Sequence, residues 1–246
     1  MSKISISGKL KEILYSAGAS LVGYADLSAL PLDVRNNLPY GISIGMPLAP
    51  DIVAELSNGP TLEYFEEYKR INLSLRKMGE FCESYLKENG YEVGLIYPVL
   101  DKYDPVMMNL VSYEPKTLST QLPHKTVATR AGLGWIGKNA LLVTKSFGSA
   151  VRLTTVLTDA DLAVDKPVDT SNCGSCTACV DVCPGHAPSG KNWAVGIHRD
   201  SFFNAASCRE SARDTAQRKI GINETVCGMC IAVCPWTQKY IKRNDR

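Results

Sequence analysis

The cysteines constrain this chain more than any other feature, because eight of its nine cysteines fall in the last third of 246 residues. The first run, CGSCTACVDVCP, begins at Cys173 and ends at Pro184. The second run, CGMCIAVCP, begins at Cys227 and repeats part of the first with one cysteine fewer. Cys208 lies between the two runs and can supply the missing thiol. The chain therefore offers its thiols as two sets of four.

The first run has the C-x2-C-x2-C-x3-C-P spacing of two-cluster bacterial ferredoxins, in which the fourth cysteine binds the other cluster. Two intervening residues let a tight turn aim neighbouring sulfurs at one cubane, and the proline stops that turn from continuing as a helix. The spacing predicts two [4Fe-4S] clusters. By the crossover rule, one is held by Cys173, Cys176, Cys179 and Cys234, and the other by Cys183, Cys208, Cys227 and Cys230.

Two other uses of paired cysteines stay open at this point. C-x2-C units also bind structural zinc, and an even number of cysteines can form disulfides. Zinc sites do not require a third cysteine at the same short interval or a proline after the fourth. The clusters are therefore the favoured interpretation.

The remaining composition indicates where such a protein works. The N-terminal stretch has a short apolar run and no small-residue cleavage site after it, so we expect no signal peptide. No run of 18 apolar residues occurs, and hence no membrane segment is expected. These features predict a cytoplasmic protein, whose reducing surroundings disfavour disulfides. The net charge of +2 is too balanced to indicate nucleic-acid binding by itself.

Hydrophobic periodicity predicts a mixture of helices and strands before the cysteine runs. Helices are expected over residues 8–18, 61–89 and 124–131. Strands are expected over residues 20–24, 40–48 and 91–97, and a hairpin is expected from strands over residues 140–144 and 150–158. Cys82 lies on the apolar face of the long helix, which favours a buried thiol over a ninth ligand. The segment 99–123 lacks periodicity, and a loop of that length is expected either to cover a site or to be mobile.

Gly132, Gly134 and Gly137 satisfy the G-x-G-x-x-G spacing of a dinucleotide-binding loop, and Asp159 follows about 20 residues later. The context does not fit, because that loop follows a strand and opens a helix. Here a helix is expected before the glycines and strands after them. The glycines instead predict a close approach of the backbone to a cofactor or to a packed neighbouring strand.

The order of these motifs resembles the epoxyqueuosine reductase family, cobalamin-dependent iron–sulfur enzymes of tRNA modification that are distantly related to reductive dehalogenases. The resemblance is strongest in AGLGWIGKNALLVTKSFGS, which starts at Ala131, in the acidic turn at Asp159 and in the two cysteine runs. It is weaker in GISIGMPL and in the helix that ends RKMGEFCESYLKENG.

The resemblance implies an α+β fold with two domains. A nitroreductase-like, cobalamin-processing-like α/β domain would occupy residues 1–162, and a ferredoxin-like double [4Fe-4S] domain would occupy residues 163–246. Electrons from an external donor such as ferredoxin or flavodoxin would pass through the clusters to cobalamin, reducing its cobalt to Co(I), and then to the substrate. The cofactor would be lined by Gly132, Leu133, Gly134, Trp135, Gly137, Lys138 and Asn139.

Two departures from the family pattern bear on the proton donor and on the substrate. The family's proton-donating aspartate precedes the AGLGW helix, whereas residues 116–124 here contain no acidic residue. His124 is the best-placed replacement, since an ordinary imidazole pKa of about 6.5 suits proton transfer, and the other candidates are Tyr97, Asp101 and Tyr113. Eleven residues follow Pro235, where tRNA-acting members continue into a helical-repeat domain. This favours a small-molecule or nucleoside substrate and makes tRNA a doubtful one.

Two other functions fit the same sequence. The chain could be a non-catalytic electron-transfer protein, in which the clusters serve a partner and the N-terminal domain docks to it. It could also be a flavin-dependent reductase, because nitroreductase-like domains also hold FMN.

Overall fold

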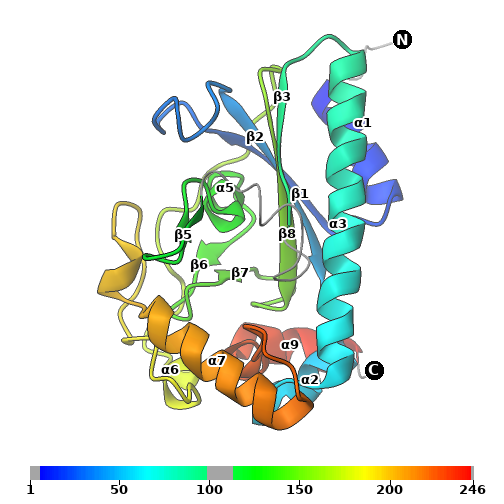
Figure 1. Ribbon diagram of the computed structural model, residues 1–246. Helices are drawn as coiled ribbons and strands as arrows, with labels where there is room; N and C mark the ends of the chain where they lie inside the picture. The colour runs from blue at the N-terminus through cyan, green and yellow to red at the C-terminus, as the bar shows by residue number, and fades with distance from the viewer. Residues whose placement is uncertain (1–5, 99–112, 245–246) are drawn as a thin grey trace.

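A four-stranded antiparallel sheet lies at the centre of the N-terminal part, with the strand order β1–β2–β8–β3 (Figure 1). The structure is a computed structural model that describes residues 6–98 and 113–244. The strands are β1 (Leu21–Asp26), β2 (Tyr40–Pro47), β8 (Val151–Thr158) and β3 (Val93–Ile96). The predicted strands over residues 20–24, 40–48 and 91–97 are thus confirmed.

Two helices, α1 (Ile6–Ser16) and α3 (Leu62–Glu88), cover one face of this sheet (Figure 1). The Thr61 side chain caps α3 by accepting a hydrogen bond from the backbone nitrogen of Tyr64 at 3.1 Å. The apolar sides of both helices pack on Ile42 and Ile44 of β2 in one large core. Cys82 is fully buried in that core, as expected, and burial raises its thiol pKa to about 12. No helix in the described ranges is both long and apolar enough to cross a membrane.

Glycines in β1 and β2 let helix α5 (His124–Arg130) approach the opposite face closely. A Cβ atom at Gly41 would lie 2.8 Å from the side chain of Val127, and one at Gly23 would lie 2.6 Å from the carbonyl oxygen of Ala131. A second, smaller core forms here, with Val127 and Leu157 at its centre. The close neighbour of these strand glycines is therefore a helix of the same chain.

The predicted hairpin of residues 140–144 and 150–158 is wrong, because its two strands enter different sheets. β7 (Leu142–Val143) pairs with β6 (Trp135–Ile136), whereas β8 pairs with β2 and β3. β8 is buried on both faces along most of its length, which requires a central place in a sheet. Part of the expected loop, residues 99–112, lies outside the described residues, and its remainder includes a short hairpin of β4 (Tyr113–Glu114) and β5 (Ser119–Thr120).

The cysteine-rich segment packs across one end of the sheet and α3 (Figure 1). The Tyr240 hydroxyl donates a buried hydrogen bond to the carbonyl oxygen of Leu48 at 2.9 Å, and Ile231 and Ile241 join the large core. This part therefore shares its core with the sheet. The boundary at residue 162 stays a prediction. The segment's elements, together with two short helices that it contacts, are α6 (Ala178–Asp181), η2 (Arg199–Ser201), α7 (Ala205–Ile220), α8 (Met229–Ala232), α9 (Pro235–Asn244), α2 (Pro50–Ala54) and η1 (Glu55–Asn58).

Gly148→Ala is expected to loosen the contact between the sheet and α9. Gly148 has a φ of +58°, and a Cβ atom there would overlap the backbone nitrogen of Thr237. The left-handed backbone alone costs a non-glycine residue about 1–3 kcal/mol, and the overlap adds to that cost. Thermal unfolding followed by circular dichroism should give a lower midpoint than in the wild type. Gly221→Ala is the control, since Gly221 has a φ of +70° with open space around its Cβ position. Equal losses in the two variants would contradict the overlap.

Candidate metal centres and active site

The structure brings Cys234 of the second run beside three cysteines of the first run. These four cysteines line a cavity of about 120 Å³, which we call the first-group cavity; its cysteines are Cys173, Cys176, Cys179 and Cys234. Pro235 and Trp236 lie on the same wall as Cys234. This grouping is the one that a crossover arrangement requires, since no single run supplies all four thiols.

The other four cysteines, Cys183, Cys208, Cys227 and Cys230, also lie close together. All but Cys227 line a larger cavity of about 460 Å³, the second-group cavity. Cys230 is near enough to interact electrostatically with the other three, and also with Cys179 of the first group, so the two groups are neighbours. Helix α7 presents Cys208 in its first turn, because the Asn204 side chain caps that helix on the backbone nitrogen of Ser207 at 3.0 Å.

The two cysteine groups consist of free thiols, most of them half-buried. All nine cysteines lie in the described ranges, and all are free thiols. Within those ranges, no three Cys, His, Asp or Glu side chains are placed so that they could hold a single metal ion. Burial, and then neighbouring cysteines, raise the thiol pKa of Cys179 and of Cys208 to about 11. Thiolates at such positions need a metal centre to stay ionised.

The glycine turn packs against protein. A Cβ atom at Gly132 would lie 2.6 Å from the carbonyl oxygen of Lys166, and one at Gly134 would overlap the carbonyl oxygen of Val143. A helix precedes this turn and a strand follows it, so the objection to a dinucleotide-binding loop is confirmed. The other expected lining residues also have packing roles: Gly137 fits tightly against Asn139 and Val143, Leu133 packs against α5, and the Trp135 ring meets Trp236 edge-on at 5.2 Å.

Lys138 and Asn139, the last two of the seven expected lining residues, do lie on cavity walls. Lys138 is 4% exposed, and its Nζ donates to the carbonyl oxygen of Cys176 at 2.9 Å, which puts a cation beside the first group. Asn139 lines both the first-group and the second-group cavity. Its Nδ2 donates to Ser149 Oγ at 3.2 Å and its Oδ1 accepts from the backbone nitrogen of Leu141 at 3.2 Å. Asn139 is therefore fixed between the two cysteine groups.

A third cavity of about 360 Å³, the His124 cavity, adjoins the second-group cavity. Lys125 and Leu141 line both cavities and so form their common wall. The Nζ of Lys125 donates to the carbonyl oxygen of Ala140 at 2.6 Å, and burial, followed by the charge of Arg199, lowers its pKa to about 8. The three cavities thus form a row from the first cysteine group, past Asn139 and Lys125, to His124.

His124 is held in a neutral state. Its Nδ1 lies 2.9 Å from Thr155 Oγ1, and its ring also forms a hydrogen bond with the backbone of Tyr97. Burial and the charge of Arg152 lower its pKa to about 4. The argument from an ordinary imidazole pKa was therefore wrong, because the sequence did not reveal this burial.

Tyr97 lines the same cavity as His124. Burial raises the pKa of its phenol, which stays protonated at neutral pH. Asp101 lies outside the described residues, and so does the side chain of Tyr113.

Sequence reasoning missed two cations near these cavities, Lys125 and Arg152. Arg152 lies over the Tyr68 ring at 4.1 Å, and its Nε donates to Asn72 Oδ1 at 3.0 Å. A charged residue within an otherwise apolar and threonine-rich strand is unusual for a buried strand, so Arg152 was a detectable signal. Lys125 has no such signal, because a lysine in the first turn of a short helix is ordinary.

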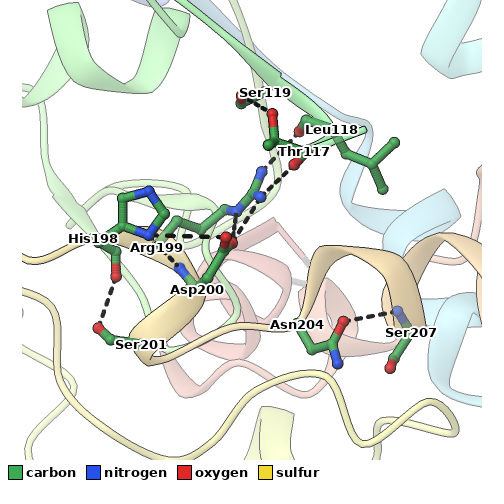
Figure 2. Close-up of polar contacts among 9 residues, drawn as sticks. All are labelled: Thr117, Leu118, Ser119, His198, Arg199, Asp200, Ser201, Asn204 and Ser207. Atoms are coloured by element: carbon green, nitrogen blue, oxygen red, sulfur yellow. Dashed lines mark hydrogen bonds and ion pairs between the residues drawn. The ribbon is translucent and has the colours of Figure 1, made fainter. Parts of the chain in front are cut away.

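Arg199 fastens the β4–β5 turn to the cysteine-rich segment, as Figure 2 shows. Its guanidinium donates to the carbonyl oxygens of Thr117 and Leu118, the latter at 2.7 Å, and its Nε donates to Asp200 at 2.8 Å. Leu118 and Arg199 both line the second-group cavity. The turn therefore forms part of the wall of that cavity and is held there by one side chain.

Comparison with known proteins identifies relatives of both parts. The family model described as "4Fe-4S double cluster binding domain" matches residues 172–237. The epoxyqueuosine reductase of Bacillus cereus is 32% identical over 186 residues, which cover 71% of this chain and 46% of the relative. The chain spans less than half the length of the curated relatives that it matches.

Two kinds of solved structure share the fold. A catabolic reductive dehalogenase in complex with 3-bromo-4-hydroxybenzoic acid has a TM-score of 0.68 at 16% identity, covering 94% of this chain and 31% of that one. An epoxyqueuosine reductase solved with a modified tRNA stem loop has a TM-score of 0.59 at 19% identity, covering 94% and 64%. The expected resemblance is confirmed. The mixed helix and sheet fold with a double-cluster segment is confirmed as well.

Cys234→Ser is expected to remove the same cluster as Cys173→Ser, although the two residues belong to different runs. Iron content should fall from about eight to about four atoms per chain in each variant. In reduced protein, electron paramagnetic resonance should show the same remaining signal for both, and Cys208→Ser should remove the other signal. Cys82→Ala, a buried thiol outside both groups, is the control and should keep both signals. Loss of one common signal in Cys234→Ser and Cys208→Ser would contradict the crossover.

His124→Gln is expected to flatten the pH dependence of stability below pH 6.5. The imidazole has a pKa of about 4 in the folded protein and about 6.5 when unfolded. The unfolded state therefore binds more protons in this window, so wild-type stability is full above pH 6.5 and falls as the pH drops toward 4. Urea midpoints between pH 5 and 7.5 measure the slope. His198→Gln is the control, since that side chain is 81% exposed. A wild-type slope in His124→Gln would refute the buried neutral state.

Proposed function

Because the chain is related in sequence to the epoxyqueuosine reductases and contains a double-cluster segment, we propose that it is an iron–sulfur reductase that uses a corrinoid. The observation that carries this proposal is the common wall of the second-group and His124 cavities. Lys125 and Leu141 form that wall, so a bound cofactor there would lie directly beside Cys183, Cys208 and Cys230. A protein that only carried electrons would need no such cavity.

The cysteines are proposed as the ligands of two [4Fe-4S] clusters, with Cys234 and Cys183 exchanged between the runs. When bound, the clusters would supply one-electron redox chemistry, with an external protein such as ferredoxin or flavodoxin as the electron donor. The buried Lys138 stabilises the negative charge of the first cluster, because a cation in a low-dielectric interior is only weakly screened. Asn139 lines both the first-group and the second-group cavity, so it would lie between the two clusters.

The two larger cavities adjoin each other and have the chemical character of a cofactor site. Each lies within the 300–1,000 Å³ range that is typical of ligand sites. Their walls are mainly apolar, with a few convergent polar groups such as Lys125, Arg152 and Ser149, as is usual for cofactor sites. The corrinoid would supply the strongly reducing cobalt chemistry, while the chain binds, orients and excludes water.

His124 and Tyr97 are proposed to serve the proton that a reduction consumes. The His124 ring forms hydrogen bonds with Thr155 and with the Tyr97 backbone, so it keeps Tyr97 in place on the cavity wall. The Tyr97 phenol stays protonated because burial raises its pKa, and it can donate a proton to a substrate anion. The proposed substrate is a small molecule or a nucleoside.

Corrinoid binding by anaerobically reconstituted protein tests this proposal directly. One cobalamin per chain should bind, with the absorption spectrum of the base-off form. Leu141→Trp, which fills the common wall, should weaken binding by about tenfold or more, since overpacking costs about 1–3 kcal/mol. Leu73→Trp is the control, because Leu73 is 43% exposed on α3; iron content should be unchanged in both variants.

Two results would overturn the corrinoid assignment. Release of FMN on denaturation would identify a flavin-dependent reductase. Rapid and reversible cluster reduction in a protein that binds no corrinoid would identify an electron-transfer protein.

A further inference from the structure

We infer that a phosphate group binds at the wall of the second-group cavity, on Arg209 and Arg213 of α7. These residues lie one turn apart, so their side chains project from the same side of the helix. Both line the second-group cavity, and both also line an adjoining recess of about 380 Å³ whose other charged residues are Lys116 and Glu210. The two arginines therefore stand where the second-group cavity meets the surface.

The charges around this cavity are unbalanced. Lys125, Arg199, Arg209 and Arg213 line it, against the single carboxylate of Glu224. Lys125 and Arg199 are engaged, the first with a backbone carbonyl and the second with the β4–β5 turn and Asp200. For Arg209 and Arg213, the described part of the chain supplies no hydrogen bond or ion pair, and Arg213 Nε is buried without an acceptor.

An unpartnered buried guanidinium N–H is costly, and buried polar groups in folded proteins are nearly always paired. Another arginine of helix α7, on its exposed side, does have a carboxylate partner. Arg218, one turn beyond Asp214, pairs with that carboxylate at 2.8 Å on the exposed side of the same helix. The outer arginine is satisfied within the chain, whereas the inner pair is left for a ligand.

Phosphate is the ligand that best matches this pair. A guanidinium presents a planar fork of donors that binds two oxygens of a phosphate at once. Two such forks one helical turn apart can hold a single tetrahedral anion from two sides. Because Cys183, Cys208 and Cys230 line the same cavity, the bound phosphate would lie next to the second cysteine group.

Two ligands could bring a phosphate to this place. One is a corrinoid, whose nucleotide tail contains a phosphodiester; this identification rests on the proposed function. The other is a separate phosphate or phosphate ester that enters through the recess. The anion site itself depends only on the arginines, so it can be tested without any corrinoid.

Phosphorus NMR of inorganic phosphate with the cluster-loaded protein tests the site alone. The reduced cluster is paramagnetic, so phosphate bound beside it should relax several-fold faster than with protein that carries Arg213→Ala or Arg209→Ala. Arg218→Ala is the matched control and should behave as the wild type. Equal relaxation in wild type and Arg213→Ala would overturn the inference. The inference would also be overturned if the arginine variants changed the reduction potential of the cluster but not the relaxation of phosphate. In that case the arginines would only offset the charge of the cluster.

Cobalamin and cobinamide, which lacks the phosphodiester tail, distinguish the two sources. If the corrinoid supplies the phosphate, Arg213→Ala should weaken cobalamin binding by about tenfold and leave cobinamide binding unchanged. If a separate phosphate binds there, inorganic phosphate should compete with neither corrinoid, and only the relaxation effect should respond to the variant. Failure of the protein to bind any corrinoid would defeat the proposed function but leave the phosphate result to decide this inference.

Discussion

The meeting of Cys234 with the first cysteine run is the constraint on which the rest of this structure depends. It obliges the end of the chain to return across the sheet, and the residues after Cys234 make the contacts that hold it there. Trp236 packs on Trp135 of the glycine turn, and Thr237 lies against Gly148. The first cysteine group and the protein core therefore depend on each other, because Cys234 directly precedes α9 and reaches its group only when α9 is packed in place.

Burial gives the cavities their chemical character. A group removed from water favours its neutral form unless an opposite charge is near. His124 and Tyr97 stay neutral, because burial dominates their pKa values. Lys138 lies next to the first cysteine group, where a cluster with thiolate ligands is anionic. The neutral proton-bearing groups lie at the far end of the row, where the charge of Arg152 also disfavours protonation of His124.

Features that depend on a local pattern, such as helices and cysteine spacing, could be predicted from the sequence. Features that depend on which distant segments pack together, such as strand pairing and burial, could not. Periodicity located α3 and α5, and the cysteine spacing anticipated that Cys234 would join the first group. The strand β8 was given the wrong partner, because its local turn at Gly148 looks like a hairpin while its burial on both faces appears only in the assembled sheet. The glycine turn could not be assigned either, since the spacing of glycines reveals close approach but not to what. His124 was found by position, yet its pKa of about 4 arises from surroundings that no single segment contains.

The strand glycines determine, through the packing of α5, where His124 and Lys125 lie. Gly23 and Gly41 have no side chains, so α5 can lie close on the sheet. The position of α5 fixes His124 and Lys125 together, because they are adjacent in its first turn. Lys125 lies on the wall shared with the second-group cavity, and His124 is held by Thr155 of the central strand β8. A side chain at either glycine would therefore displace His124 and Lys125 together. The change would affect the site although neither glycine lines it.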